Sequence, residues 1–515
     1  MDSIKKRFIF TLAARLVSFI VGIATAGIIP RSLGPVNYGN YQFLQSMFLE
    51  TKNLLDLYAS GAFYSDSSKN QRTGTSTVVF LVWEFLQNAL IFLFISLTVI
   101  LGFYGSLWPH QEVKLIYAVA GIAMLAILEG RFLSYADSKA LTVFAQIAKL
   151  CCYVIQVMLI VFLFLNNRLD LNAYVMINYA VLLISIAILG VYFRIKWKSI
   201  FINDISRENL KKTLSYYKSY SSPLIAYTIV GFLYTYFNRW FLQLIGGGQE
   251  QGYYSLAFNC SQIIMIFSCS MTPIFWREMS LSFEKKDIER MRFFFGRNLK
   301  IFFFATCLIS AFICVQSEII IKYLAGKAFA SAIFPFIIMA FYPVFQTYGQ
   351  LGGTFFLATD RTRQYGKIGI MTMLAGTMLT YFLLAPQSFL IPGLGLGSLG
   401  LAIQMVMFQI FYVNILLYFN CRYLSMSFKH YLMYQGGVIL MMVSISYLTG
   451  RLSSSILSQF SLSKDVSNIT GFFSSGIIYT AIICALAYLF PVLTGIERKE
   501  YKSIINRMLP FRNAV

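Results

Sequence analysis

Apolar stretches of about twenty residues recur along the whole chain, and this pattern restricts the fold more than any other feature. A bilayer core requires about 20 consecutive apolar residues for each helix that crosses it. The chain has 515 residues, of which 58% are hydrophobic and only 12% charged, against about 25% charged in a typical soluble domain. The stretches are continuously apolar rather than alternating, which favours helices over barrel strands. We therefore expect an all-α polytopic membrane protein.

The apolar stretches predict about fourteen transmembrane helices. Their ranges are roughly 8–29, 41–63, 78–103, 113–134, 141–165, 173–194, 221–245, 253–276, 298–316, 333–358, 367–386, 396–419, 431–449 and 470–491. The first stretch follows three basic residues, as a secretory signal peptide does. However, Arg15 interrupts its core and the stretch continues to Ile29, so we interpret it as the first transmembrane helix.

The distribution of basic residues predicts the orientation of the chain. The formal net charge is +21, with 42 Lys and Arg. If the N-terminus lies inside, the inward segments hold 31 of these residues and the outward loops hold 7. Basic residues remain on the cytoplasmic side of a membrane. We therefore expect both termini in the cytoplasm, and we read the positive charge as a membrane-face signal rather than a nucleic-acid-binding surface.

The cysteines and histidines indicate no cofactor. Eight cysteines are scattered along the chain, mostly inside apolar stretches, and none form a Cys-x-x-Cys pair. The two histidines, His110 and His430, stand far apart in the sequence. Zinc and haem sites need a clustered ligand set, so we expect neither, and we interpret the thiols as small apolar side chains.

A polar, basic break at 195–220 divides the chain. It predicts a six-helix N-terminal lobe at 1–198, a cytoplasmic connector at 199–220, a six-helix C-terminal lobe at 221–420, and two further helices with a basic tail at 421–515. Glycine-containing outward loops at 33–41 and 245–254 occupy the same place in each lobe. Six spans is an even number, so the lobes would form a parallel repeat. Chance recurrence of Gly-rich turns is the alternative.

Several short motifs accompany this organisation. They are Arg31, Ser32, Leu33, Gly34 and Pro35 with Tyr38 and Gly39; Leu55, Asp56 and Leu57 before Gly61; Asn238 and Arg239 with Gly246, Gly252 and Tyr253; and Pro273. On these residues, the length and the span count, the chain resembles the multidrug/oligosaccharidyl-lipid/polysaccharide (MOP) exporter superfamily. Within it, the chain resembles the O-antigen and capsule repeat-unit flippases. Asn238 is a departure, because members often carry an acid there, which puts a cation-coupling role at this position in doubt.

The resemblance implies a function. Such a protein would move undecaprenyl-pyrophosphate-linked oligosaccharide repeat units from the cytoplasmic to the periplasmic leaflet of the bacterial inner membrane, by alternating access and without covalent chemistry. Its partners would be this lipid-linked oligosaccharide, membrane lipids, H⁺ or Na⁺ as a counter-ion, and other polysaccharide-assembly membrane proteins. Candidate hinges are Gly34, Pro35, Gly246, Gly252 and Pro273, with ordinary turns and kinks as the alternative.

Once the 38 basic residues of the inward segments and outward loops are set aside, four remain within predicted spans: Arg15, Lys52, Lys149 and Arg239. Each costs about 2.5 to 3.5 kcal/mol at a helix centre, unless it faces protein or water. A hydrated cationic cavity removes most of this cost and would bind an anionic pyrophosphate, with arginine as a bidentate partner. Arg15 and Lys149 have an alternative, because both are near enough to a helix end to reach the interface.

The second predicted span carries a polar stripe at helical spacing, which includes Gln45, Glu50, Asn53 and Asp56. We interpret the stripe as cavity lining with a role in ion coupling. A local ion pair between Lys52 and Asp56, four residues apart, is the alternative. Glu84 and Glu129 are also inside spans. They would either exchange protons or pair with Arg15 or Arg131.

Two other functions were weighed. A membrane polysaccharide polymerase or glycosyltransferase needs a sizeable external loop, but the longest outward loop, 450–469, carries only Asp465 as an acid. We therefore expect no enzymatic activity. A drug or cation exporter of the same superfamily would have an acidic or apolar cavity, so the sign of the cavity charge separates it from a flippase.

Overall fold

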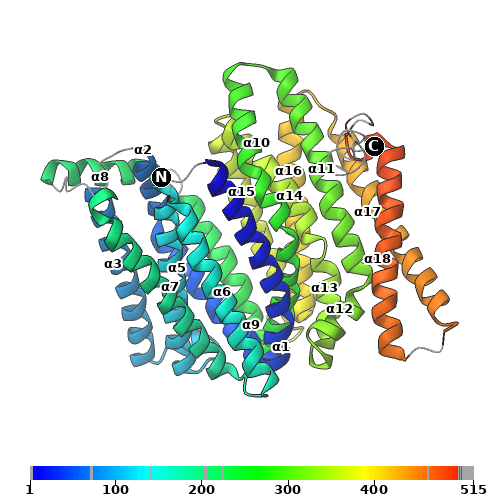
Figure 1. The fold of residues 1–515 in the computed structure, drawn as a ribbon, viewed down its shortest axis with the longest axis horizontal. Helices are drawn as coiled ribbons and strands as arrows, with labels where there is room; N and C mark the ends of the chain where they lie inside the picture. Colours follow the sequence, from blue (N-terminus) through cyan, green and yellow to red (C-terminus); the bar gives the residue numbers. More distant parts are fainter. Residues whose placement is uncertain are drawn as a thin grey trace, which may run out of the picture. The chain divides into compact units, whose positions relative to one another are not determined.

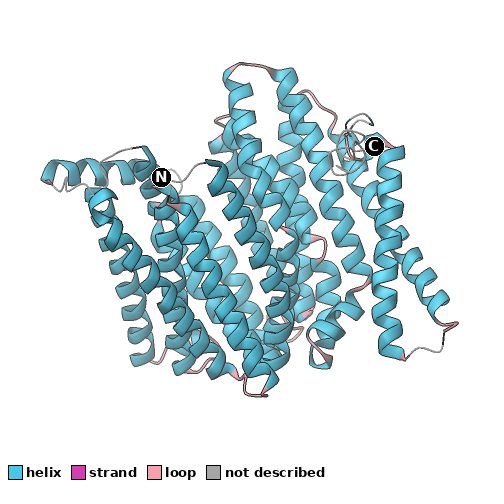
Figure 2. Ribbon diagram, in the orientation of Figure 1, coloured by secondary structure: helices cyan, strands magenta, loops and turns pink. Residues whose placement is uncertain are grey.

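The computed structural model contains helices and loops, and no strand occurs in the residues it describes (Figure 2). These residues are 4–69, 74–139, 141–200, 206–222, 225–460, 463–496, 498 and 500. The helices before residue 225 are α1 (Ile4–Asp56), α2 (Ala59–Lys69), α3 (Gly74–Ile100), α4 (Tyr104–Leu107), α5 (Val113–Ser138), α6 (Thr142–Leu165), α7 (Leu171–Ile200) and α8 (Arg207–Ser221). The all-α class expected from the sequence is confirmed.

The remaining helices follow in the same manner (Figure 1). They are α9 (Ile225–Ile264), α10 (Ile266–Glu284), α11 (Ile288–Val315), α12 (Ser317–Leu324), η2 (Lys327–Ala332), α13 (Ile333–Met339), α14 (Tyr342–Ala358), α15 (Thr362–Leu384), α16 (Gly397–Tyr423), α17 (Phe428–Leu457), α18 (Lys464–Leu489) and η3 (Pro491–Leu493). The predicted span at 333–358 is therefore divided between α13 and α14.

Ten helical segments in the described part of the chain are long and apolar enough to cross a membrane. They correspond to the predicted spans three to six and nine to fourteen. The four other predicted spans, the first two and the seventh and eighth, fall in α1, α9 and α10. At 1.5 Å per residue α1 would be about 80 Å long, which is too long for a single crossing.

A single glycine interrupts α1 and another interrupts α9. Gly34 has φ 71° and ψ 167°, and Gly247 has φ 61° and ψ −166°. This region of backbone space is accessible essentially to glycine alone. The breaks divide each long helix at the two loops that the sequence places in equivalent positions. Where we expected loops of several residues, the helices nearly meet at one glycine.

The end of α1 is marked by a second kind of break. Leu57 and Tyr58 both have positive φ, 47° and 62°, a conformation that is uncommon for side-chain-bearing residues. Asp56 is the last residue of α1, and α2 begins at Ala59. The predicted span 41–63 is therefore a helix that ends at Asp56, with a sharp turn into α2.

The chain divides into two compact units. The first unit comprises Met1–Ser255 and Thr377–Ser398, and the second comprises Leu256–Gly376 and Leu399–Val515. In the first unit α1 packs against α5 and α6, α7 packs against both of these helices, and α8 packs against α2 and α3. In the second unit α11 contacts α14 and α17, and α17 contacts α18. These boundaries differ in position from the lobes expected at residues 198 and 221, which remain a prediction.

Candidate functional site

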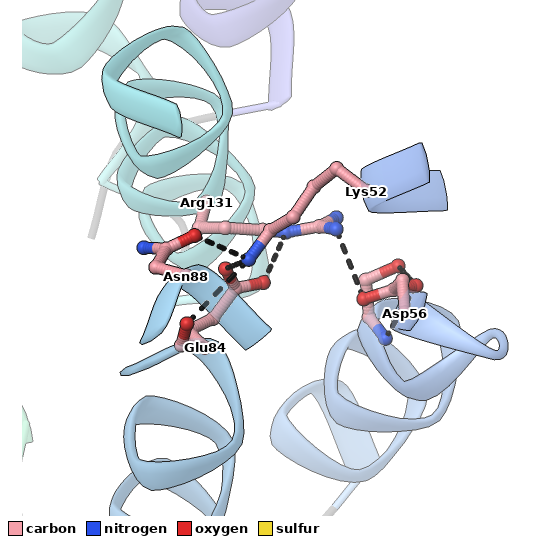
Figure 3. A network of polar contacts seen from close by, with 6 residues as sticks. Lys52, Asp56, Glu84, Asn88 and Arg131 are labelled. Atoms are coloured by element: carbon pink, nitrogen blue, oxygen red, sulfur yellow. Dashed lines mark hydrogen bonds and ion pairs between the residues drawn. The ribbon is translucent and has the colours of Figure 1, made fainter. Parts of the chain in front are cut away.

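A network of buried charges joins α1, α3 and α5 in the first unit (Figure 3). The Nζ of Lys52 lies 2.7 Å from Oε2 of Glu84, and the Nε of Arg131 lies 3.0 Å from Oε1 of the same carboxylate. The Nη2 of Arg131 also lies 3.0 Å from Oδ1 of Asp56. Lys52 is 1% exposed and Glu84 is 3% exposed, so water contributes little to the solvation of this pair.

Polar neighbours complete the network. Lys52 donates to Oδ1 of Asn88 at 2.8 Å, and the hydroxyl of Ser60 donates to Oδ2 of Asp56 at 2.6 Å. Glu84 and Asn88 are four residues apart on α3, so they lie on one face of that helix. Two cations oppose two carboxylates, so these four side chains have no net charge. Buried charges are tolerated when they are paired and hydrogen-bonded in this way.

This geometry differs from the pairing considered for Lys52 and agrees with one of the pairings considered for Glu84. The local pair between Lys52 and Asp56 is not the arrangement found, because Lys52 bonds to Glu84 and Asp56 bonds to Arg131. Of the partners considered for Glu84, Arg131 is the one present. Lys52 was expected to leave a positive charge in a cavity, yet its charge is balanced by Glu84 at short range.

Arg239 on α9 has different surroundings and is half-buried. Its Nη1 donates to the hydroxyl of Ser255 at 2.8 Å, and its Cζ lies 4.5 Å from the ring centroid of Tyr254. Guanidinium groups are attracted to aromatic faces at such distances. The Glu50 carboxylate lies close enough for electrostatic interaction with Arg239. The ring and the hydroxyl together hold this guanidinium in place.

The polar stripe of α1 separates into two sides. Lys52 and Asp56 face the buried network, whereas Gln45 and Glu50 are half-buried and Asn53 is exposed. Asn53 also hydrogen-bonds to the Glu50 side chain. One side of the predicted stripe therefore stabilises helix packing, and the other is accessible.

Of the remaining predicted binding residues, Lys149 is among the described side chains. Lys149 on α6 is half-buried, and its Nζ lies 5.3 Å from the ring centroid of Tyr153, one helical turn away. The side chains of Arg15 and Pro273 fall outside the described residues. Glu129 accepts a hydrogen bond from the hydroxyl of Ser185. The pairing considered with Arg15 falls outside the described side chains, and the ion pairs found for Arg131 are with Glu84 and Asp56.

Glycine residues allow the helical turn that follows the break at Gly34 in α1 to contact the helical turn that follows the break at Gly247 in α9. A Cβ at Gly39 would lie 1.8 Å from the carbonyl oxygen of Gly248, and a Cβ at Gly252 would lie 2.1 Å from that of Pro35. Real Cβ atoms do not approach oxygen so closely, so only glycine permits this backbone contact. The segments 35–40 and 248–252 therefore interlock within the first unit. We call this contact the glycine interlock.

Side chains support the glycine interlock. Gln111 and Gln243 both donate to Oδ1 of Asn40, at 2.9 and 3.1 Å. The Glu250 carboxylate accepts a hydrogen bond from the backbone N–H of Ser398 at 2.7 Å, at the start of α16. A carboxylate at a helix N-terminus satisfies a free N–H and interacts favourably with the helix dipole.

Asn238, the departure from the family pattern, is buried beside Arg239. Its Oδ1 accepts a hydrogen bond from the hydroxyl of Thr380 at 2.7 Å. The sequence singled out this position but gave no partner, because Thr380 is 142 residues away. Within the described residues, no group of three or more His, Cys, Asp and Glu side chains is arranged to hold a metal ion.

The sequence does not predict three residues of the site, which are Asn88, Tyr254 and Ser255. It indicates Arg131 only as one possible partner of Glu84 or Glu129, although Arg131 falls inside the predicted range 113–134. Asn88 follows Glu84 by one helical turn, which also indicated a shared face. Tyr254 and Ser255 follow the Gly252 motif directly, yet nothing in the sequence pairs them with Arg239.

Comparison with known proteins identifies a family that matches this sequence and structures that have a similar fold. The model of a family described as polysaccharide biosynthesis protein matches residues 4–275, and no curated protein sequence matches the chain. The fold is similar to that of the lipid II flippase MurJ in an inward closed conformation, with a TM-score of 0.67 at 15% identity over 94% of this chain and 98% of that one.

Multidrug transporters have a related fold. An inward-facing multidrug resistance MATE family transporter of the MOP superfamily matches with a TM-score of 0.60 at 13% identity, over 80% of this chain and 94% of that one. A Vibrio cholerae MATE transporter matches with a TM-score of 0.53 at 14% identity, over 80% and 94%. These identities establish the fold alone. Because the family match spans more than half of the residues, the chain belongs to the polysaccharide biosynthesis protein family and has the helical fold of MOP superfamily transporters.

Proposed function

We propose that this protein is a flippase that moves an undecaprenyl-pyrophosphate-linked oligosaccharide, of the O-antigen or capsule repeat-unit class, across the bacterial inner membrane. The polyprenol tail remains in lipid while the headgroup crosses through the protein from the cytoplasmic to the periplasmic leaflet. Both termini lie in the cytoplasm, in keeping with the distribution of basic residues. An anion moving outward is favoured by about 2.3 kcal/mol per charge per 100 mV, with H⁺ or Na⁺ as an additional driving ion.

The observation that carries this proposal is the setting of Arg239. It is a half-buried arginine, held by Tyr254 and Ser255, within a helix of a transporter fold. A positive charge at membrane depth is expensive and usually functional. A fixed guanidinium has the fork of donors that a phosphate oxygen pair requires, so we assign the pyrophosphate contact to Arg239 first.

The other predicted site residues take graded roles in the proposal. Lys149 and Arg15 supply further positive charge to the headgroup. Gln45, Glu50 and Asn53 line the path, and the hydroxyl and amide groups of the sugar units suit such polar side chains. Lys52, Asp56 and Glu84 form a neutral network with Arg131. We therefore propose that the network positions the helices. Proton coupling at Glu84 or Asp56 is a separate prediction, which disruption of the network would test.

Alternating access requires the glycine interlock to open. The interlock joins the helical segments 35–40 and 248–252, which the basic-residue distribution places on the outward side, so its contacts would close that side. Gly34, Pro35, Gly246, Gly252 and Pro273 are the hinge positions of the proposal. Only the positive-φ backbone at Gly34 and the contact at Gly252 add structural support for individual members of this set.

A reconstitution experiment tests the proposed function. The purified protein is placed in liposomes, and translocation of a pyrophosphate-linked polyprenyl glycolipid is measured for the wild type, Arg239→Gln and Arg168→Gln. Arg168 is an exposed arginine in the turn between α6 and α7, so it controls for the loss of one charge. We expect at least a tenfold loss of rate with Arg239→Gln, equal to about 1.4 kcal/mol, and none with Arg168→Gln. Equal rates in all three proteins would refute the site assignment.

The cation-exporter alternative is tested in the same liposomes. Glu50 lies beside Arg239, and a carboxylate there would attract an organic cation. Transport of a cationic dye without transport of the glycolipid would favour the exporter. Transport of the glycolipid alone would favour the flippase, because the two substrates carry opposite charges.

A further inference from the structure

A basic cavity in the second unit lies outside the groups described above. It has a volume of about 420 Å³. It is open on one side, and three chain segments line it: the first turns of α11, the turn between α16 and α17, and the turn after η3. Its lining includes Arg292, Arg297, Lys300, His430 and Tyr431, with Phe293 and Met426 as apolar neighbours. We call it the α11 cavity.

The cations of the α11 cavity lie along one side of a helix. Arg292, Arg297 and Lys300 are five and three residues apart on α11, and no acidic side chain is among the described lining residues. Arg292 is held in place because its Nε donates to the backbone oxygen of Leu424 at 2.8 Å. Two of the three cations, Arg292 and Arg297, are therefore held by a partner.

A carboxylate already neutralises part of the positive charge of the cavity. Oε2 of Glu500 lies 2.7 Å from Nη2 of Arg297, so among the described residues one carboxylate lies against the three cations. The N-terminus of α17 adds to the positive potential, because Ser427 caps this 30-residue helix and His430 lies in its first turn. Among the described residues, positive charge therefore exceeds negative charge in the cavity, and a further anion would balance it.

We propose that the α11 cavity binds the phosphodiester headgroup of an anionic membrane phospholipid, of the phosphatidylglycerol class. Basic pockets between transmembrane helices at the cytoplasmic side bind such headgroups. The location supports a lipid rather than a free phosphate, because α11 is a candidate membrane span and Phe293, 63% exposed, lies at the cavity for contact with an acyl chain. This inference is independent of the transported substrate.

A lipid-binding measurement tests the proposal. The full-length protein in a neutral detergent is mixed with phosphatidylglycerol, with phosphatidylcholine, or with inorganic phosphate, and retained adducts are counted by native mass spectrometry. We expect phosphatidylglycerol to be retained in preference to phosphatidylcholine, and inorganic phosphate not to displace it. Equal retention of the two lipids would overturn the proposal. Displacement by inorganic phosphate would identify a free-phosphate site and overturn the lipid assignment as well.

Two variants locate the binding. Arg297→Gln with Lys300→Gln removes two cations from the cavity, and we expect about tenfold or greater weakening of phosphatidylglycerol binding. Lys285→Gln with Lys286→Gln is the matched control, because both residues are exposed in the turn between α10 and α11.

If the first variant fails to fold, His430→Glu replaces it. A glutamate at the third position of α17 suits the Ser427 cap and brings a negative charge to the cavity. Unchanged phosphatidylglycerol binding in the folded variant would overturn the proposal.

Discussion

The ammonium of Lys52 and the carboxylate of Glu84 form a 2.7 Å ion pair between α1 and α3, and both side chains are almost completely buried. Arg131 and Asp56 extend the pair into a neutral network. A buried pair of this kind has a small net effect as a pair and a large effect when one partner is lost, because the remaining charge is left without compensation.

Single substitutions in this pair should therefore be much worse than the double substitution. We expect Lys52→Met or Glu84→Gln to lower the stability of the first unit by about 3 to 5 kcal/mol, and the double variant to recover part of that loss. Thermal unfolding in detergent measures the effect. Lys212→Met and Glu208→Gln, which break an exposed pair on α8, are the control and should each change stability by no more than about 1 kcal/mol. Strictly additive losses in the double variant would contradict the coupling.

The geometry of Arg131 predicts that lysine cannot replace it. Its Nε bonds to Glu84 and its Nη2 bonds to Asp56, and only the planar fork of a guanidinium supplies two such donors in fixed positions. Arg131→Lys should cost about 1 to 3 kcal/mol, although it preserves the charge. A thermal unfolding transition equal to that of the wild type would show that charge alone sustains the network.

The glycine interlock predicts that small side chains disrupt it. Alanine at Gly39 or Gly252 would place a Cβ within 2.1 Å of a backbone oxygen, so the two turns must separate. We expect a loss of about 1 to 3 kcal/mol. In the proposed flippase, a cysteine introduced beside the interlock should also react faster with a membrane-impermeant thiol reagent.

Gly366→Ala provides the matched control for the interlock. Gly366 lies in α15, and a Cβ there would meet nothing within 4 Å. This substitution should be neutral or stabilising by up to about 1 kcal/mol, because alanine favours helix. If Gly252→Ala behaved as Gly366→Ala does, the turns would not be in the contact described.

Loss of the Glu250 carboxylate should destabilise the start of α16 by a smaller amount. Glu250→Ala removes the acceptor for the N–H of Ser398 and should cost about 1 kcal/mol, as loss of a helix cap does. Glu318→Ala is the comparison, because Glu318 is exposed in the first turn of α12. Hydrogen exchange at the first turn of α16 should increase in the Glu250 variant alone. Unchanged protection there would rule out a capping role.

The spans were predictable because the bilayer demands the same apolar length from every helix that crosses it. The ten membrane-length helices agree with ten predicted spans. The boundaries at Gly34 and Gly247 were placed within loops, since glycine indicates a break, but its backbone angles depend on neighbouring turns. The division at Leu57 and Tyr58 gave no signal, because neither residue favours the positive φ that the structure imposes.

The sequence alone determined that this protein is a bundle of membrane-length helices, because hydropathy is a local property of the chain, and its short motifs resemble those of MOP exporters. It also indicated that Lys52, Asp56, Glu84 and Arg239 lie inside spans. Only the tertiary structure decided their partners. Glu84 balances Lys52 across 32 residues, Arg131 reaches Asp56 across 75, and Tyr254 and Ser255 hold Arg239. Charge pairing depends on distance in space, and helical periodicity reports only which face a side chain takes.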